Sequence, residues 1–269
     1  MKPISLSLSI TSLLLSNYAN AATLPTSSSD NVETRDFRIP TSYESAVLGR
    51  RILALTPLGN IATVFPDDSN KTSSSEKRPS NLGGSPLSLI EYIADCESEG
   101  NPTILALRIS SAFKNIAAGS NVSLSLAWTP PHPPAKRIQS SSWFSSLFSS
   151  RHHHHKEPVP YSAANLPRFS LHGWIEAIPA ADEKGSDIAK CFVDIHQDAK
   201  YWLPGNRIHE AHFVRLVVEH VYWVGGFGDR AYIGWIDKEE WSKVKKEEWE
   251  AVRLPGEKKG WKEWSVEDL

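Results

Sequence analysis

Histidines at two places in the chain could bind a metal ion. His209-Glu210-Ala211-His212 is close to the zinc-binding pattern His-Glu-x-x-His, but its histidines are three residues apart and it precedes a strand. Both imidazoles need not then face one way, so we predict no metal site there. The run His152 to His155 could bind a transition metal loosely, as any exposed histidine tract can, and a solvated loop is the preferred interpretation. We predict no metal site from either segment.

Two further features could take part in catalysis or phosphate binding. His196, at the end of a predicted helix, could donate a proton, but no carboxylate or nucleophile partner can be assigned to it. A structural role is preferred, because a cation at the C-terminal end of a helix interacts favourably with the helix dipole. Gly225-Gly226-Phe227-Gly228 joins two strands instead of opening a helix, so we interpret it as a tight turn. We therefore predict no catalytic residue.

Cys96 and Cys191 are the two cysteines of the chain. Secreted proteins meet oxidising conditions in which two cysteines can pair. Their separation in space cannot be read from the sequence. A Cys96–Cys191 disulfide and two buried free thiols both stay open.

The first residues are typical of a secretory signal peptide. Lys2 precedes an apolar run from Ile4 to Leu15, and the small residues of Ala19-Asn20-Ala21 form a cleavage site. Asn70-Lys71-Thr72 and Asn121-Val122-Ser123 are N-glycosylation sequons. We therefore expect a secreted chain, or one in the lumen of the secretory pathway, glycosylated at one or both asparagines.

Composition excludes some classes of protein. The formal charge of −2 argues against nucleic-acid binding, which needs a basic face. No segment reaches the roughly 18 apolar residues of a membrane span. Apolar residues make up 40% of the chain, so we expect a globular body.

Apolar alternation predicts most of the secondary structure. Val122, Leu124 and Leu126, for example, alternate as in a half-buried strand. Thr41 or Ser42 can cap the first helix and Pro57 ends it. We predict helices over 43–56 and 182–195, and strands over 60–65, 87–94, 103–109, 121–129, 168–178, 212–224 and 231–236. Without alternating β-α-β units, this order favours a mainly β protein, an antiparallel barrel or sandwich with flanking helices.

The chain divides into four segments. A signal peptide (1–21) and a flexible segment (22–41) precede a β-domain (42–236), which has a Pro/Ser/His-rich disordered insertion at 130–167. Residues 237–269 are highly charged, and their aromatic residues recur at helical spacing, which predicts a C-terminal amphipathic helix and tail.

The order of several short motifs resembles the CREG-like branch of the pyridoxamine 5′-phosphate oxidase-like, FMN-binding split barrels. The resemblance extends over about 42–236. It implies a six-stranded antiparallel split β-barrel and a homodimer, with any flavin at the subunit interface, in a secreted or lysosomal glycoprotein. The motifs are Ala62-Thr63-Val64, Pro86-Leu87-Ser88-Leu89, Asn121-Val122-Ser123-Leu124, Leu171-His172-Gly173, His196-Gln197-Asp198-Ala199 and Gly225-Gly226-Phe227-Gly228.

The resemblance also implies where an FMN phosphate would bind. The usual Ser-Arg-Lys triplet falls on Ser110-Ser111-Ala112, which lacks both basic residues, and Glu91 stands where a lysine is expected. A phosphate dianion needs charge-assisted donors, and a carboxylate repels it. Arg108 and Lys114, with the hydroxyls of Ser110 and Ser111, could compensate if flavin binds. We expect no cofactor, with FMN as the possibility to test.

These observations favour a non-enzymatic binding or signalling module. A flavin-dependent oxidoreductase with a modified FMN site is the alternative, with a haem-related activity as a variant of it. The sequence names no ligand, whether protein or small molecule. The strands over 168–178 and 212–224 are apolar on both faces, so we expect a homodimer to cover the outer face unless the C-terminal tail does so.

Overall fold

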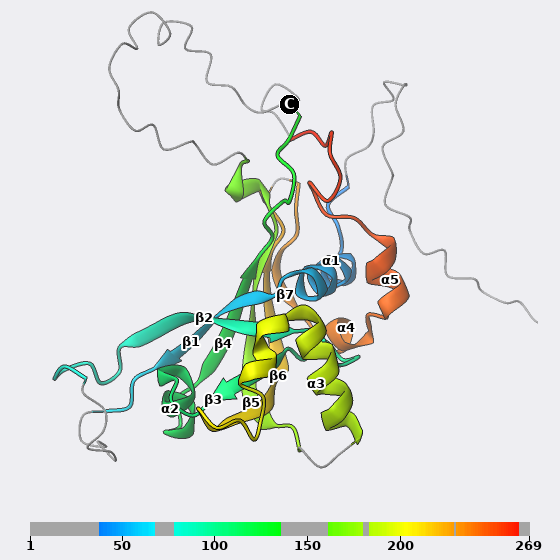
Figure 1. The fold of residues 1–269 in the computed structure, drawn as a ribbon. Coiled ribbons are helices and arrows are strands. Elements are labelled where there is room, and N and C mark those ends of the chain that lie inside the picture. The colour runs from blue at the N-terminus through cyan, green and yellow to red at the C-terminus, as the bar shows by residue number, and fades with distance from the viewer. Residues whose placement is uncertain (1–37, 68–77, 136–160, 180–182, 229, 264–269) are drawn as a thin grey trace, which may run out of the picture. The chain divides into compact units, whose positions relative to one another are not determined.

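The computed structural model describes residues 38–67, 78–135, 161–179, 183–228 and 230–263 (Figure 1). The predicted signal peptide, the sequon at Asn70 and the histidine run 152–155 lie outside the described residues.

Seven antiparallel strands form one sheet that closes on itself. The strand order is β3-β2-β1-β4-β5-β6-β7, and an additional pairing between β3 and β6 closes six of the strands into a barrel. The last strand, β7, pairs only with the second half of β6 and extends the sheet beyond the barrel. The predicted mainly β, six-stranded barrel is therefore confirmed. The strands are β1 (Leu58–Val64), β2 (Pro86–Ala94), β3 (Thr103–Leu107), β4 (Val122–Ala127), β5 (Arg168–Ala177), β6 (Ala211–Val224) and β7 (Ile233–Ile236).

The barrel interior is filled by alternate side chains of the strands. In β4, Val122, Leu124 and Leu126 are buried whereas the residues between them are not, as the alternation predicts. Leu171 of β5 and Val221 of β6, which are register partners, are also fully buried. This shared interior fixes the register of the strands, because a slip of one residue would turn each apolar set outward.

The first helix, α1 (Ser42–Leu55), packs against the C-terminal segment (Figure 1). The Oγ1 atom of Thr41 accepts a hydrogen bond from the Glu44 N–H, and the Glu44 carboxylate accepts one from the Thr41 N–H. This capping box begins the helix at the predicted place, and Pro57 follows its end. Gly49 brings α1 close to Trp241, because a Cβ there would lie 2.7 Å from the indole ring.

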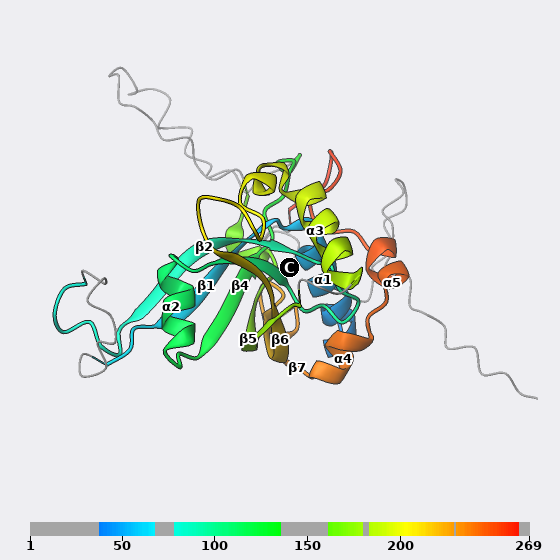
Figure 2. The ribbon, with the colours of Figure 1, turned by 60° about the horizontal axis from the view of Figure 1, so that its bottom comes forward.

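Two helices lie against the remaining parts of the barrel (Figure 2). The predicted second helix is α3 (Glu183–Ile195), whose Ile188 and Phe192 pack with Leu105 and Phe213 in a second apolar cluster. The predicted strand over 103–109 is too long, because β3 ends at Leu107 and the short helix α2 (Ser111–Ala117) follows. The prediction missed α2 because its seven residues give little periodicity.

The predicted C-terminal amphipathic helix is divided into two short helices, α4 (Lys238–Lys243) and α5 (Lys246–Ala251). The backbone is extended at Val244 and Lys245, which separates them. Val244 is buried at this break, and α5 also packs against α1. There the Tyr43 hydroxyl donates a hydrogen bond to Glu248 (2.8 Å). Contacts with α1 thus override the continuous helical pattern of the sequence.

The ends of the predicted insertion are ordered parts of the body. The N–H groups of His132 and Ala135 donate to the carbonyls of Gly256 and Trp261, and Leu166 is buried in the core. Residues 163–165 form a short 3-10 helix. The predicted disordered insertion, 130–167, is therefore too long at both ends, because the described residues there belong to the folded body.

Candidate functional site

The predicted cofactor residues gather where β2 and β3 meet α2. Glu91 lies on β2, and Ser110 immediately precedes α2. The Ser110 hydroxyl donates a hydrogen bond of 3.2 Å to the Glu91 carboxylate. Burial raises the pKa of Glu91, and the Ser110 hydrogen bond opposes this in part. The structure thus places a carboxylate beside the hydroxyl that the resemblance assigns to a phosphate.

Arg108 lies next to this carboxylate site but is engaged elsewhere. Its Nη1 atom donates to Glu210 Oε2 (2.6 Å), and its backbone N–H donates to the Glu210 carbonyl (3.0 Å). Both side chains are exposed, and the ion pair lowers the pKa of Glu210. The guanidinium is therefore partly neutralised.

The other predicted cofactor residues lie on α2. Ser111 is its half-buried first residue, and the exposed Lys114 follows one turn later. Ala112, where the resemblance expects a lysine, is only 1% exposed and belongs to the core. A lysine at this position would have to bury its ammonium group, which is costly without a counter-charge.

A hollow of about 370 Å³ lies beside Arg108 and is lined by residues 204–212. Asn206 organises this loop: its amide donates to the Leu203 and His209 carbonyls, and its Oδ1 accepts from the N–H groups of Ile208 and His209. His212 is the second residue of β6, and its Nε2 lies 3.5 Å from Glu210 Oε1. Among the described residues, no three metal-ligating side chains come together.

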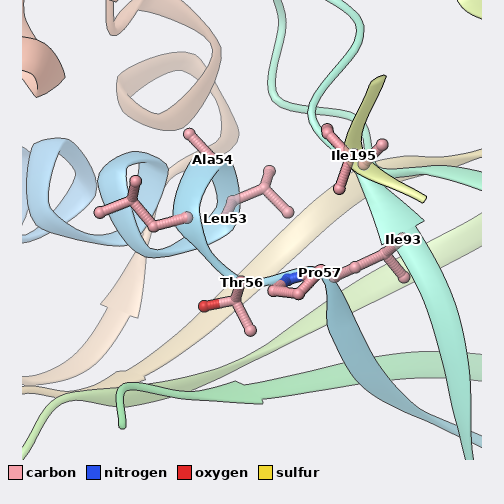
Figure 3. Close-up of a pocket in the computed structure, with 8 residues that line it drawn as sticks. Leu53, Ala54, Thr56, Pro57, Ile93 and Ile195 are labelled. Carbon is pink, nitrogen blue, oxygen red and sulfur yellow. The ribbon is translucent and has the colours of Figure 1, made fainter. Parts of the chain in front are cut away.

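A second cavity, of about 160 Å³, lies between the end of α1, β2 and the end of α3 (Figure 3). Leu53, Pro57, Ile93 and Ile195 supply apolar side chains to its wall. Sites for drug-sized ligands measure about 300–1,000 Å³, so this cavity is too small for a flavin. None of the predicted cofactor residues lines it.

His196 and the glycine-rich turn have the structural roles that the sequence suggests. His196 is buried, its Nε2 donates to the Ile93 carbonyl (2.9 Å), and its ring stacks on Tyr92 at 4.4 Å. Gly226 has a φ of +145° in the connection from β6 to β7. A Cβ there would also lie 3.1 Å from the Asn165 carbonyl oxygen. These contacts hold His196 and the turn in place within the fold.

Cys96 and Cys191 form a disulfide with a Cα–Cα distance of 5.9 Å. The bond joins the segment after β2 to α3 and so attaches this helix to the barrel. The sequence left the pairing open because it gives no distance between residues 95 positions apart.

The structure also shows a buried ion pair that sequence analysis missed. Arg50 of α1 and Asp95, just after β2, lie 3.7 Å apart, and their side chains are only 2% and 6% exposed. Burial raises the pKa of Asp95 to about 6, against the opposing effect of Arg50. Burial also lowers the pKa of Arg50. The sequence signal that could have revealed this ion pair is an arginine on the apolar face of the first predicted helix.

The family model for the CREG β-barrel matches residues 40–243. The chain belongs to the CREG β-barrel family. The resemblance predicted from the sequence is thus confirmed for the family and the fold. No curated protein sequence matches this CREG-family chain.

Several solved structures resemble this CREG-family chain at low sequence identity. A haem-binding protein from Mycobacterium smegmatis has 19% identity and a TM-score of 0.48, covering 77% of this chain and 62% of its own. ChuZ from Campylobacter jejuni has 13% identity and a TM-score of 0.46, covering 78% and 65%. An FAD-binding protein from Mesorhizobium loti has 13% identity and a TM-score of 0.36, covering 64% and 87%. The chain thus spans less than two thirds of the M. smegmatis and C. jejuni proteins.

Proposed function

We propose that this CREG-family chain is a secreted, N-glycosylated homodimer that acts as a non-enzymatic binding or signalling module. The observation that supports this most is the hydrogen bond between Ser110 and the Glu91 carboxylate. A carboxylate therefore stands at the position where a flavin phosphate would need a cation.

The surroundings of Glu91 add to this argument. Arg108 is paired with Glu210, and Ala112 is buried in the core. The residues present therefore do not fit an FMN phosphate, and we derive no flavin chemistry for this chain.

The outer face of β5, β6 and β7 supports the homodimer. Trp174 is 48% exposed and Trp235 is 58% exposed, with Tyr222 beside Trp235 at a ring distance of 5.1 Å. The alternative cover, the C-terminal tail, lies elsewhere as far as it is described: Trp261 packs on the main core and donates to the His132 carbonyl (2.7 Å). A second copy would remove these aromatic rings from water.

Three observations support secretion. The disulfide between Cys96 and Cys191 suits an oxidising compartment. Asn121, the described sequon residue, is exposed just before β4. The N-terminal residues have the composition of a signal peptide. No helix in the described part of the chain is long and apolar enough to cross a bilayer.

A flavin-dependent oxidoreductase is the second candidate, supported by Lys114. Its ammonium group is exposed one turn into α2, and it has no ion-pair partner within the described ranges. In that case Arg108, Ser110, Ser111 and Lys114 would hold the phosphate.

The test is an FMN titration of three proteins. The wild-type chain should show no saturable FMN binding. The double variant Glu91→Gln, Ser111→Arg should gain affinity, because the first change removes the carboxylate and the second adds a cation nearby. The matched control, Glu250→Gln with Ser242→Arg, makes the same charge change on the exposed surfaces of α5 and α4 and should not bind. Stoichiometric binding by the wild type would overturn the proposal, and no gain by the double variant would count against its charge explanation.

A further inference from the structure

Two histidines face each other across neighbouring strands on the outer face of the barrel. His172 of β5 and His220 of β6 are direct register partners in the antiparallel pair. The neighbouring positions Leu171 and Val221 are buried in the interior, so the histidines lie on the opposite face. His220 is exposed and His172 is half-buried.

A tryptophan of the next strand lies beside both imidazoles. The ring centre of Trp235, on β7, is 5.9 Å from that of His172 and 6.2 Å from that of His220. Within the described part of the chain, neither imidazole makes a hydrogen bond or an ion pair. No group in the described part of the chain therefore occupies their ring nitrogens.

A β-bulge fixes this pairing. The register shifts between His172 and Gly173, so that Glu219 of β6 is the extra residue. The Glu219 carboxylate pairs with Lys238 (3.2 Å). Gly173 is required at the bulge because a Cβ there would lie 1.8 Å from the Val217 carbonyl oxygen.

We propose that His172 and His220 form a chelating pair that binds one late divalent transition-metal ion, with Cu²⁺ preferred over Zn²⁺. Opposite residues of an antiparallel pair have Cβ atoms about 4.5–5.5 Å apart, so two imidazoles can reach a common ion. Imidazole suits copper, zinc and nickel, and Cu²⁺ binds most tightly in this series. Water would complete the coordination.

The electrostatics agree with this assignment. Burial and the neighbouring His220 lower the pKa of His172. A lowered pKa favours the neutral imidazole, which is the form that binds a metal. The site needs residues of only one copy and no flavin, but it lies on the β5-β6-β7 face of the proposed dimer, so a second copy would lie beside the bound ion.

The experiment is a Cu²⁺ titration of the full chain with all four histidines of 152–155 replaced by serine, because that run binds metals itself. Binding is followed by calorimetry and by tryptophan fluorescence, since bound Cu²⁺ would quench nearby Trp235. We expect one ion per chain, with weaker binding of Zn²⁺.

Variants in this background separate the pair from other histidines. His172→Gln and His220→Gln should each weaken Cu²⁺ binding by at least about tenfold, because each removes a direct ligand. His212→Gln, a control at an exposed histidine at the start of β6, should leave the affinity unchanged. Trp235→Phe should reduce the quenching while calorimetry still shows binding.

Circular dichroism of each variant checks that it is folded. Unchanged Cu²⁺ affinity in folded His172→Gln and His220→Gln, or no uptake of copper by the parent, would overturn the proposal.

Discussion

Glu91 and Asp95 lie four residues apart, on and just after β2, and differ in what surrounds them. Burial raises the pKa of both carboxyl groups. Asp95 faces the guanidinium of Arg50, whereas Glu91 has the hydroxyl of Ser110 and, among the described residues, no ion-pair partner.

The difference is that Asp95 faces an arginine whose contacts extend to several elements of the fold. The Arg50 guanidinium donates to the Ser98 carbonyl (2.9 Å) and lies over the Trp241 ring, with 5.8 Å from its central carbon to the ring centre. The indole N–H of Trp241 donates to the Gly100 carbonyl (3.0 Å). These contacts join α1, α4 and the turn before β3, so Asp95 is structural. Glu91 is half-buried and has the Ser110 hydroxyl as its hydrogen-bond partner among the described side chains, so we propose that its charge affects binding rather than stability.

The largest effect should come from the disulfide beside Asp95. Replacing Cys96 and Cys191 together by serine should lower the free energy of unfolding by about 2–5 kcal/mol, the range for native disulfides of small secreted domains. Chemical denaturation of wild type and variant measures it. A loss below about 1 kcal/mol would show that α3 is held by its apolar contacts alone.

A smaller loss should follow a change of Gly100. Its φ is +74°, and a Cβ there would lie 2.5 Å from Arg50 Nε, so Gly100→Ala both strains the backbone and displaces the guanidinium. We expect a loss of about 1–3 kcal/mol. Gly119→Ala is the matched control, since its φ is +94° with nothing within 4 Å. Equal losses in denaturation of the two variants would mean that only the backbone conformation matters.

Asp95 should make the protein more stable in mild acid. The pKa of Asp95 is about 6 in the folded chain, against an ordinary value of 3.8. Its contribution to the free energy of unfolding is therefore full below pH 3.8 and is lost as the pH rises through 6. Lowering the pH from about 7 to about 5 should therefore add about 1 kcal/mol, or about 3 °C in Tm.

Thermal melts of wild type and Asp95→Asn across this pH range test the point. The Tm of the variant should depend less on pH, because an amide does not titrate in this range. An identical pH slope in both proteins would assign the effect to other groups.

The smallest effect on stability is expected at Glu91. Glu91→Gln removes a partly buried charge whose pKa is raised, so the free energy of unfolding at neutral pH should change by no more than about 0.5 kcal/mol. A large loss in a urea melt would make Glu91 structural, like Asp95, and would remove the contrast between them.

Much of the fold could be predicted from the sequence, but less of the sites could. Alternation in β4 and the capping residue Thr41 are local signals, and both are found where predicted. The break at Val244 depends on contacts with α1, and the closeness of His172 to His220 depends on a bulge between strands. Such features arise from residues distant in the sequence, so no local pattern reveals them.

The absorbance spectrum of the purified native protein, before and after incubation with FMN and removal of free flavin, tests the central claim most directly. A carboxylate at Glu91 and a buried alanine at 112 predict a colourless protein that retains no flavin. A yellow protein that retains one FMN per chain would contradict the account and favour the flavoenzyme.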